Sequence, residues 1–192
     1  MPFWTSANSE PRRSHRFLLT LPNLKSADLS HSYQQYLAKT AGKPSYSINT
    51  AEHKFLGNTY YYPGTVTWQP VSVQIVNAVN PDGNLIIMDA LAGAGYMAPP
   101  TQEDYFFNIS QSPSTVNKEL ALKVVGDVII EELNGVGGLV GTWTLQNSFI
   151  TDAKFGDLSY DSDELLNIDL TFRYDWAEYK SGIAVPAATD LN

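Results

Sequence analysis

A strict alternation of apolar and polar residues near the C-terminal end constrains the fold more than any other feature of the sequence. From Leu166 to Trp176, apolar residues occupy every second position and polar residues occupy the positions between them. Side chains of a β-strand point alternately to the two faces of its sheet, so this segment has one buried face and one wet face. The pattern predicts one long antiparallel strand.

Shorter patterns of the same kind indicate that most of the chain is extended. Strands are predicted at 16–21, 65–76 and 142–149. In 65–76 the apolar set shifts by one residue after Pro70, which predicts a β-bulge within a single strand. Residues 118–132 also have apolar side chains in step, and are predicted to be extended.

Residues 45–62 predict a long hairpin that protrudes from the domain. Two extended pieces, Ser45–Asn49 and Lys54–Tyr62, are expected to be joined through Thr50–His53, and Pro63-Gly64 follows as a turn signal. The hairpin has too few apolar residues to fill a core, and an isolated hairpin is marginally stable in water. It must therefore lie against its own domain or against a neighbouring copy.

One α-helix is predicted at 81–94. Asn80 is suited to cap it, a proline stands at its first position, and Gly95 is suited to end it. Residues 85–88 are apolar on every side of one turn, which favours burial on more than one face. A second, short helix is considered around residues 29–38.

Length and charge limit the classes of function. The 192 residues suit a single domain, 1–192, with an N-terminal arm at 1–14 and a flexible tail at 181–192. A net charge of −8 argues against a protein that grips nucleic acid or an anionic membrane. No apolar run reaches the roughly 18 residues of a membrane span, and the first residues lack the apolar core of a signal peptide. We therefore expect a soluble protein made in a cytoplasm, without a membrane anchor.

Composition and charge distribution are compatible with assembly. Charged residues make up 17% of the chain, against about 25% in ordinary domains, and aromatic residues make up 12%. Such a surface often contacts a partner, although a strand-rich chain favours aromatic residues in any case. Residues 1–100 carry more basic than acidic groups, and residues 101–192 carry five basic and fifteen acidic groups. A split of this kind can favour head-to-tail stacking, but it also occurs without such stacking.

The candidate chemical motifs do not form a recognisable catalytic or cofactor site. There is no cysteine, and the three histidines lack metal-ligand spacing. The glycine-rich stretch 135–141 has Val140 where a dinucleotide loop needs its third glycine, and a period-two segment follows instead of a helix. The acidic residues of 157–164 are read as a hairpin turn, because a calcium loop would need glycine at Leu166. The sequence thus predicts no catalytic residue, no metal ligand and no cofactor, and the protein is not expected to be an enzyme.

The C-terminal half resembles the tail tube protein family of contractile-tailed bacteriophages (myoviruses). The motifs are Trp143-Thr-Leu-Gln-Asn-Ser-Phe-Ile, then Phe155-Gly-Asp-Leu-Ser-Tyr, then the acidic turn and Asn167-Ile-Asp-Leu-Thr-Phe-Arg-Tyr-Asp-Trp176. The likeness covers about residues 15–179, and its last forty residues are the specific part. The arm 1–14, the stretch 23–42 and the tail after Lys180 depart from the pattern.

The resemblance implies a mainly β fold and a structural role. It implies an antiparallel β-sandwich or partial barrel with one flanking α-helix and a long protruding hairpin, which completes a larger barrel in a ring oligomer. Six copies would form a ring, and stacked rings would form the inner tube through which DNA is ejected into the host. The implied partners are the tail sheath protein, the baseplate and tail-terminator proteins, and genomic DNA that passes without specific binding. The implied location is the phage tail, assembled in the host cytoplasm.

Particular residues are expected at two kinds of surface. The polar faces of 65–76 and 166–176 are expected to line the channel, with Arg173 pairing to Asp169 or Asp175 in an otherwise acidic or neutral lining. The candidate lumen-facing residues are Asn167, Asp169, Thr171, Arg173 and Asp175. The candidate inter-subunit residues are Tyr60, Tyr61, Tyr62, Leu85, Ile86 and Met88.

Other functions remain open on the sequence. The chain fits a tube-initiating or capping relative at the baseplate as well as the main tube subunit. A β-sandwich carbohydrate-binding or virion-decoration module is an alternative of a different class, in which surface aromatics would stack on sugar rings. Size separates these readings, because a tube protein forms rings or filaments on concentration and a binding module stays small.

Overall fold

Ten β-strands and two α-helices form the parts of the chain that the structure describes. The computed structural model describes residues 11–25, 35–96, 115–161 and 163–182. The strands are β1 (Phe17–Thr20), β2 (Ala38–Ala41), β3 (Tyr46–Phe55), β4 (Asn58–Trp68), β5 (Val71–Val76), β6 (Val128–Leu133), β7 (Leu139–Gln146), β8 (Phe149–Lys154), β9 (Asn167–Arg173) and β10 (Trp176–Ser181). The helices are α1 (Gly83–Gly93), α3 (Lys118–Val125) and the short 3-10 helix η2 (Gln35–Leu37).

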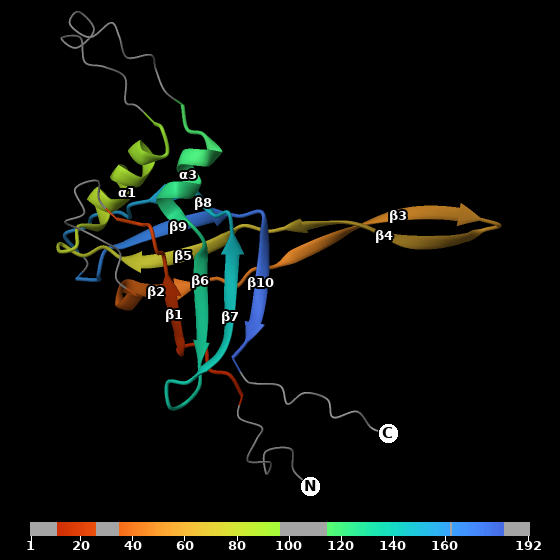
Figure 1. The fold of residues 1–192 in the computed structure, drawn as a ribbon, viewed down its shortest axis with the longest axis horizontal. Coiled ribbons are helices and arrows are strands. Elements are labelled where there is room, and N and C mark those ends of the chain that lie inside the picture. The colour runs from red at the N-terminus through yellow and green to blue at the C-terminus, as the bar shows by residue number, and fades with distance from the viewer. Residues whose placement is uncertain (1–10, 26–34, 97–114, 162, 183–192) are drawn as a thin grey trace, which may run out of the picture.

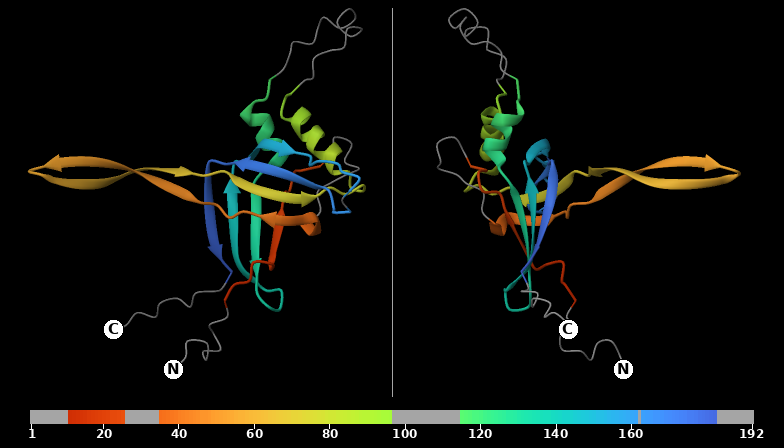
Figure 2. Two further views of the ribbon diagram at one scale, coloured as in Figure 1. Left: turned by 180° about the vertical axis from the view of Figure 1, so that it is seen from behind. Right: turned by 45° about the vertical axis from the view of Figure 1, so that its right-hand side comes forward.

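Two four-stranded antiparallel sheets form the body, and their strands run across each other (Figures 1 and 2). One sheet has the order β1-β6-β7-β10 and the other has the order β2-β5-β9-β8. Strands β3 and β4 pair with each other and extend away from the body as a hairpin. The predicted mainly β, antiparallel fold with a protruding hairpin is confirmed. The described residues contain two α-helices rather than one, and their strands do not close into a barrel within one subunit.

The core lies between the two sheets. Strand β9 buries Ile168, Leu170 and Phe172, which lie opposite the alternating apolar residues of β5. The other sheet contributes Leu19 and Leu145, which are also fully buried. Burial of each such side chain contributes about 1.5–3 kcal/mol, so the alternation in the sequence fixes which sheet face is inside.

The predicted strand 166–176 contains a corner. Strand β9 ends at Arg173, and after Tyr174-Asp175 the chain enters β10, which pairs with β7 in the other sheet. The prediction of a single strand is wrong. The alternation persists because Tyr174 still points into the core, where it is 6% exposed.

The predicted strand 65–76 is also two strands. Residues 65–68 are the end of β4 in the hairpin, and β5 begins at Val71 in the body. The phase shift after Pro70 therefore marks the passage from one sheet to another, and not a bulge within one strand. Proline suits this connection because it has no backbone N–H to donate.

The hairpin is longer than predicted and turns at a different place. Its strands pair from Tyr46↔Trp68 out to Phe55↔Asn58, and the turn consists of Leu56 and Gly57. Residues 50–53, predicted as the link, lie within β3. Pro63-Gly64 lies within β4, where the register shifts by one residue.

The helix boundaries differ from the prediction at the start of α1. Asp82 caps this helix in place of Asn80, because its side chain accepts hydrogen bonds from the backbone N–H groups of Asn84 (3.0 Å) and Leu85 (3.2 Å). The predicted end is confirmed, since Gly95 has a φ of +107° just beyond the helix.

Residues 118–132 are helical in their first half, so the prediction of an extended segment is wrong there. Asn117 caps α3 by accepting from the N–H of Leu120 at 2.9 Å. Gly126, with a φ of +71°, ends the helix, and β6 follows. The apolar residues that appeared in step belong to a helix with Ala121 and Val125 on its buried side.

Three predicted segments lie partly outside the described residues: the arm 1–14, the helix at 29–38 and the tail 181–192. The described end of 29–38 is η2 followed by Ala38, the first residue of β2. Among the described residues, no helix combines the length and the apolar character needed to cross a membrane.

Candidate assembly surfaces

The outward face of the β2-β5-β9-β8 sheet is polar. Strand β9 places Asn167, Asp169, Thr171 and Arg173 at the positions that alternate with its core residues. Strand β5 adds Ser72 and Gln74 opposite Thr171 and Asp169. Strand β8 adds Asp152 and Lys154 beside the same two residues of β9. We call these eight residues the polar sheet face, and it brings together four of the five predicted lumen-facing residues.

Charges on the polar sheet face are balanced. Two carboxylates, Asp152 and Asp169, accompany two cations, Lys154 and Arg173. Asp169 accepts a hydrogen bond from Gln74 at 2.8 Å, and Lys154 lies 3.9 Å from Asp152. The polar sheet face is therefore neutral on balance, and the partner found for Asp169 is Gln74 and not Arg173.

Asp175 lies at the corner after β9 and not on the strand. Its carboxylate accepts hydrogen bonds from Lys118 Nζ at 2.7 Å and from Asn147 Nδ2 at 2.9 Å. The hydrogen bond from Lys118, followed by that from Asn147, lowers the pKa of Asp175 below its ordinary value of 3.8. Asp175 thus connects α3 to the corner. Its partners are Lys118 and Asn147, and not Arg173, with which pairing was predicted.

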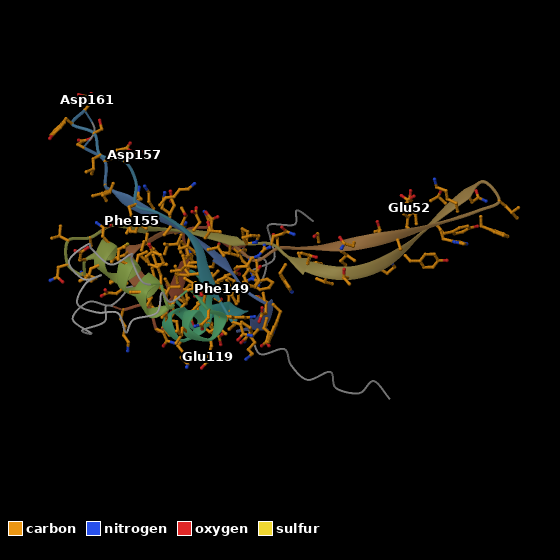
Figure 3. All side chains as sticks on the ribbon, turned by 90° about the horizontal axis from the view of Figure 1, so that it is seen from above. Glu52, Glu119, Phe149, Phe155, Asp157 and Asp161 are labelled. Carbon is orange, nitrogen blue, oxygen red and sulfur yellow. The ribbon has the colours of Figure 1, made fainter. Side chains whose placement is uncertain are left out.

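The hairpin exposes its aromatic side chains on both faces. Tyr60, Tyr61 and Tyr62 are 47%, 65% and 55% exposed. Residues paired directly across a hairpin share a face, so Tyr60 and Tyr62 lie with His53 and Ala51, and Tyr61 lies with Glu52 on the other face. Figure 3 shows Glu52 far out along the hairpin, and Asp157 and Asp161 at the opposite end of the molecule.

Aromatic rings fix the root of the hairpin to the body. The Trp68 ring centroid lies 5.4 Å from that of Tyr46 and 6.0 Å from that of Tyr174. The Gln69 N–H donates to the Ser45 carbonyl at 2.8 Å across the root. Burial raises the pKa of Tyr174 above its ordinary value of 10.0. The direction of the hairpin is therefore set by the packed core beneath it.

Helix α1 divides the predicted inter-subunit residues. Leu85 and Met88 are 39% and 51% exposed, whereas Ile86 is 4% exposed and belongs to the core of its own subunit. Ile86 is thus not available to a neighbour, which corrects its place among the candidates. The sequence predicted that residues 85–88 are buried on more than one face. It did not distinguish a face buried against the subunit's own sheet from a face buried against another subunit.

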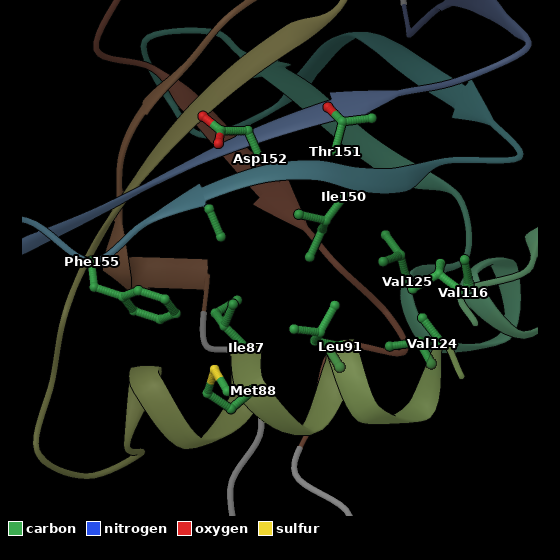
Figure 4. Close-up of a pocket in the computed structure, with 14 residues that line it drawn as sticks. Ile87, Met88, Leu91, Val116, Val124, Val125, Ile150, Thr151, Asp152 and Phe155 are labelled. Atoms are coloured by element: carbon green, nitrogen blue, oxygen red, sulfur yellow. The ribbon is translucent and has the colours of Figure 1, made fainter. Parts of the chain in front are cut away.

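An apolar groove lies between α1, α3 and β8, with a volume of about 460 Å³. Figure 4 shows Ile87, Met88 and Leu91 of α1 pointing toward Ile150 of β8, with Phe155 at one end. Valines from and beside α3 close the other end, while Thr151 and Asp152 point away from α1. We call this space the helix groove. Sequence reasoning missed it because it missed α3, although the Asn117 cap and the Glu119–Lys123 spacing were available signals.

A buried carboxylate joins the start of the described chain to the body. Glu132 of β6 is 6% exposed and forms ion pairs with Arg12 and Lys43. Arg12 also donates to the Tyr179 hydroxyl at 2.9 Å, and this bond, more than Glu132, raises the pKa of Arg12. Burial alone would raise the pKa of Glu132, but the two cations outweigh it and lower the pKa. No sequence pattern indicated this cluster, because its members are far apart in the chain.

The described residues contain no metal-binding cluster. Within these ranges, no group of three or more histidine and acidic side chains is placed to hold a metal ion. Residues 135–138 of the glycine-rich stretch lie in the connection between β6 and β7, and residues 139–141 begin β7, where a Cβ at Gly141 would collide with the Tyr179 ring.

Solved structures of contractile injection systems share this fold. A chain of the PVC sheath/tube terminator in the extended state aligns with a TM-score of 0.56 and 17% identity, covering 91% of this chain and all of that chain. A chain of the PVC sheath-tube complex aligns with 0.55 and 17%, covering 94% and 99%. A chain of the 6-fold symmetrised baseplate of the anti-feeding prophage (AFP) aligns with 0.51 and 19%, covering 91% and 98%. No protein-family model and no curated protein matches the sequence. The chain therefore has a fold found in the sheath-tube, terminator and baseplate structures of contractile injection systems.

Proposed function

We propose that this protein is a structural subunit of the inner tube of a contractile tail, in which six copies form a ring and the rings stack. The observation that carries the proposal is a sheet with one core face, one polar face and two unpaired edges, β2 and β8, among the described strands. Open edges of this kind favour aggregation unless they are paired or covered.

Ring formation accounts for both the edges and the polar face. Strand β8 of one copy lies next to strand β2 of the following copy, so that the four-stranded sheets join into one larger barrel without edges. The contact is heterologous, and a ring results when the rotation between copies closes. The polar sheet face then lines the bore.

The bore is suited to the passage of DNA. Asn167, Asp169, Thr171 and Arg173 face the lumen together with the balanced charges of β8. A neutral wall releases few counterions from DNA, so DNA slides without being held. The tube thus serves as the conduit for DNA ejection from a phage tail, with the sheath, baseplate and terminator proteins as its partners. The subunit assembles in the host cytoplasm and acts without catalysis or cofactor.

A tube-initiating or capping role at the end of a tail is the second candidate. The likeness to chains of the AFP baseplate and the PVC terminator supports it as well as the tube role. A subunit that begins or closes a tube forms single rings, whereas a main tube subunit forms filaments.

Negative-stain microscopy and light scattering of the purified protein over rising concentration test the proposal. We expect rings or filaments with a central bore. Folded protein that remains monomeric at every concentration contradicts it, and retention of such monomers on a glycan column supports a carbohydrate-binding module instead.

Labelling of Thr171→Cys tests the bore, because the natural chain has no cysteine. In filaments, a small maleimide is expected to react and a bulky polymer-linked maleimide is expected to be excluded, except near filament ends. Leu158→Cys, at an 88% exposed position, is the control for free access. Equal reaction of both reagents at Thr171→Cys contradicts the lumen assignment.

A further inference from the structure

A buried carboxylate occupies a position in β6 where the strand pattern predicts an apolar side chain. Val128, Ile130 and Glu132 are the buried residues of β6 and alternate with half-buried ones, so all three lie on the core side of the sheet. The Glu132 side chain is 8% exposed. Buried ion pairs can often be replaced by apolar side chains of similar volume without loss of stability. Stability alone therefore does not explain a charge at this position.

Two cations share the single negative charge of Glu132. Arg12 pairs with its Oε2 atom and Lys43 pairs with its Oε1 atom. The three side chains together carry one positive charge in excess, and the two like charges around one carboxylate repel each other. One cation is sufficient to neutralise the carboxylate. Each cation is therefore bound less tightly than it would be as the sole partner of Glu132.

Lys43 is kept beside Glu132 by the backbone around it. It lies in the link between β2 and β3. The Gly42 N–H donates to a carbonyl of β5 at 2.8 Å, and the Ser45 carbonyl accepts from the N–H of the residue after β4 at 2.8 Å. Pro44 restricts its own backbone and that of the lysine before it. This cation therefore has a fixed place next to the carboxylate.

The segment before β1 is held in a different way, through the side chain of Arg12. Residues 11–15 are all exposed, so none of them packs into the core. The Arg12 guanidinium pairs with Glu132, donates to the Tyr179 hydroxyl at 2.9 Å and lies 5.8 Å from the centroid of the Tyr179 ring. The Arg12 side chain itself is 50% exposed. Release of this one side chain would thus detach the segment without opening the core.

We propose that residues 11–15 form a releasable strap, which Arg12 fastens to Glu132 and which opens while Lys43 keeps the buried carboxylate paired. The second cation makes the release possible, because a buried carboxylate without a partner is strongly destabilising. In the open state Arg12 and Arg13 are available to other groups, and the core of the subunit stays intact. The inference goes beyond the proposed function and does not depend on how copies assemble.

Limited trypsin proteolysis of Lys43→Gln tests the strap, because cleavage after Arg13 reports the population of the open state. Mass spectrometry follows this cleavage, and cleavage after Lys54, which is exposed in β3, is the reference. In the variant, Arg12 is the sole partner of Glu132 and is held more tightly. We expect cleavage after Arg13 to be slower by on the order of threefold, the size of one exposed ion pair. Unchanged or faster cleavage overturns the inference, since a merely structural lysine would give that result.

Arg12→Gln is expected to have the opposite effect in the same assay. The variant keeps the cleavage site after Arg13 and loses the side chain that fastens the strap. We expect cleavage there to be about tenfold faster than in the natural protein, as for loss of a hydrogen bond to a charged group. His15→Gln changes another exposed side chain of the strap and is the matched control, with an expected rate near that of the natural protein. Equal rates in Arg12→Gln and the natural protein overturn the inference.

A double-mutant cycle in urea unfolding tests whether the two cations replace each other. The double variant of Arg12→Gln and Lys43→Gln leaves Glu132 without a cation. Its unfolding equilibrium constant is expected to change by about tenfold more than the product of the single changes, and in a Glu132→Gln background the product is expected to hold. A double variant that equals the product in the natural background overturns the inference. If the double variant does not fold, the cleavage rates of the single variants decide, because each of them retains one cation.

Discussion

The hairpin and the sandwich body place their apolar and aromatic side chains in opposite ways. In β5 and β9 every second residue is buried, whereas in β3 and β4 every residue except Trp68 is exposed. The body thus holds its shape through its own core. The hairpin exposes aromatic and aliphatic side chains. These side chains gain stabilising contacts only when another molecule covers them. The difference leads us to expect that the body provides the stability of the chain and that the hairpin serves the proposed assembly.

Removal of a core side chain is expected to have the largest effect on stability. Phe172→Ala deletes a fully buried ring from β9 and is expected to lower the free energy of unfolding by about 3–5 kcal/mol. Tyr61→Ala on the hairpin is the matched control, with an expected change within about 0.5 kcal/mol. Urea unfolding of the two variants measures both. A comparable loss for Tyr61→Ala would show that the hairpin belongs to the folding unit of the body.

Removal of the root ring is expected to have an intermediate effect. Trp68 is half-buried and packs against Tyr46 and Tyr174, so Trp68→Ala is expected to cost about 2 kcal/mol. It also frees the direction of the hairpin, which should reduce assembly more than stability. Amide hydrogen exchange in β3 and β4 measures this release. Unchanged exchange in β3 and β4 would contradict the inference that the aromatic cluster at the root orients the hairpin.

The two helix caps around the groove are expected to contribute less. Asp82→Ala and Asn117→Ala each remove a side chain that accepts backbone N–H groups, at a cost of about 1 kcal/mol. Thermal unfolding measures the loss. Replacement of Asn117 by aspartate should preserve stability, and a similar loss in that variant would argue against a capping role.

The pH dependence of stability is expected to report on Glu132 with a smaller effect. Its pKa is lowered in the folded protein below the ordinary value of 4.5. The stabilisation is therefore present above that value and is lost as pH falls through the folded pKa. The difference in stability between the natural protein and Glu132→Gln should shrink on acidification. Glu119→Gln, which removes an exposed pair with Lys123, is the control and should change the profile less. If the difference in stability between the natural protein and Glu132→Gln did not change with pH, the charge of Glu132 would have no role in stability.

Sequence periodicity was sufficient to predict which residues face the core. It was insufficient to predict which strands pair with each other. The alternation of 166–176 identified the buried residues Ile168, Leu170 and Phe172. It did not reveal the corner at Tyr174-Asp175, because both sheets present their apolar side to the same core. The shift at Pro70 was likewise visible, but a change of sheet and a bulge leave the same pattern in the sequence.

The candidate surfaces were predictable where a strand pattern defined them. The polar residues 167–173 follow from the alternation, and the exposure of Leu85 and Met88 follows in part from an apolar helix turn. The helix groove was not predictable from the sequence pattern that we used. The apolar residues Leu120, Leu122 and Val124 occupy every second position, so the α3 segment was predicted to be a strand. The Glu132 cluster depends on Arg12 and Lys43, which lie 120 and 89 positions before Glu132, and no local pattern can join residues so far apart.

The fixed position of the hairpin gives a polymer of this protein a direction. If the β3-β4 hairpin of each copy contacts the next copy, one end of the assembly exposes free hairpins and the other end exposes the surface that receives them. Growth at the two termini then proceeds through different chemistry, and each can be started or stopped by a different protein.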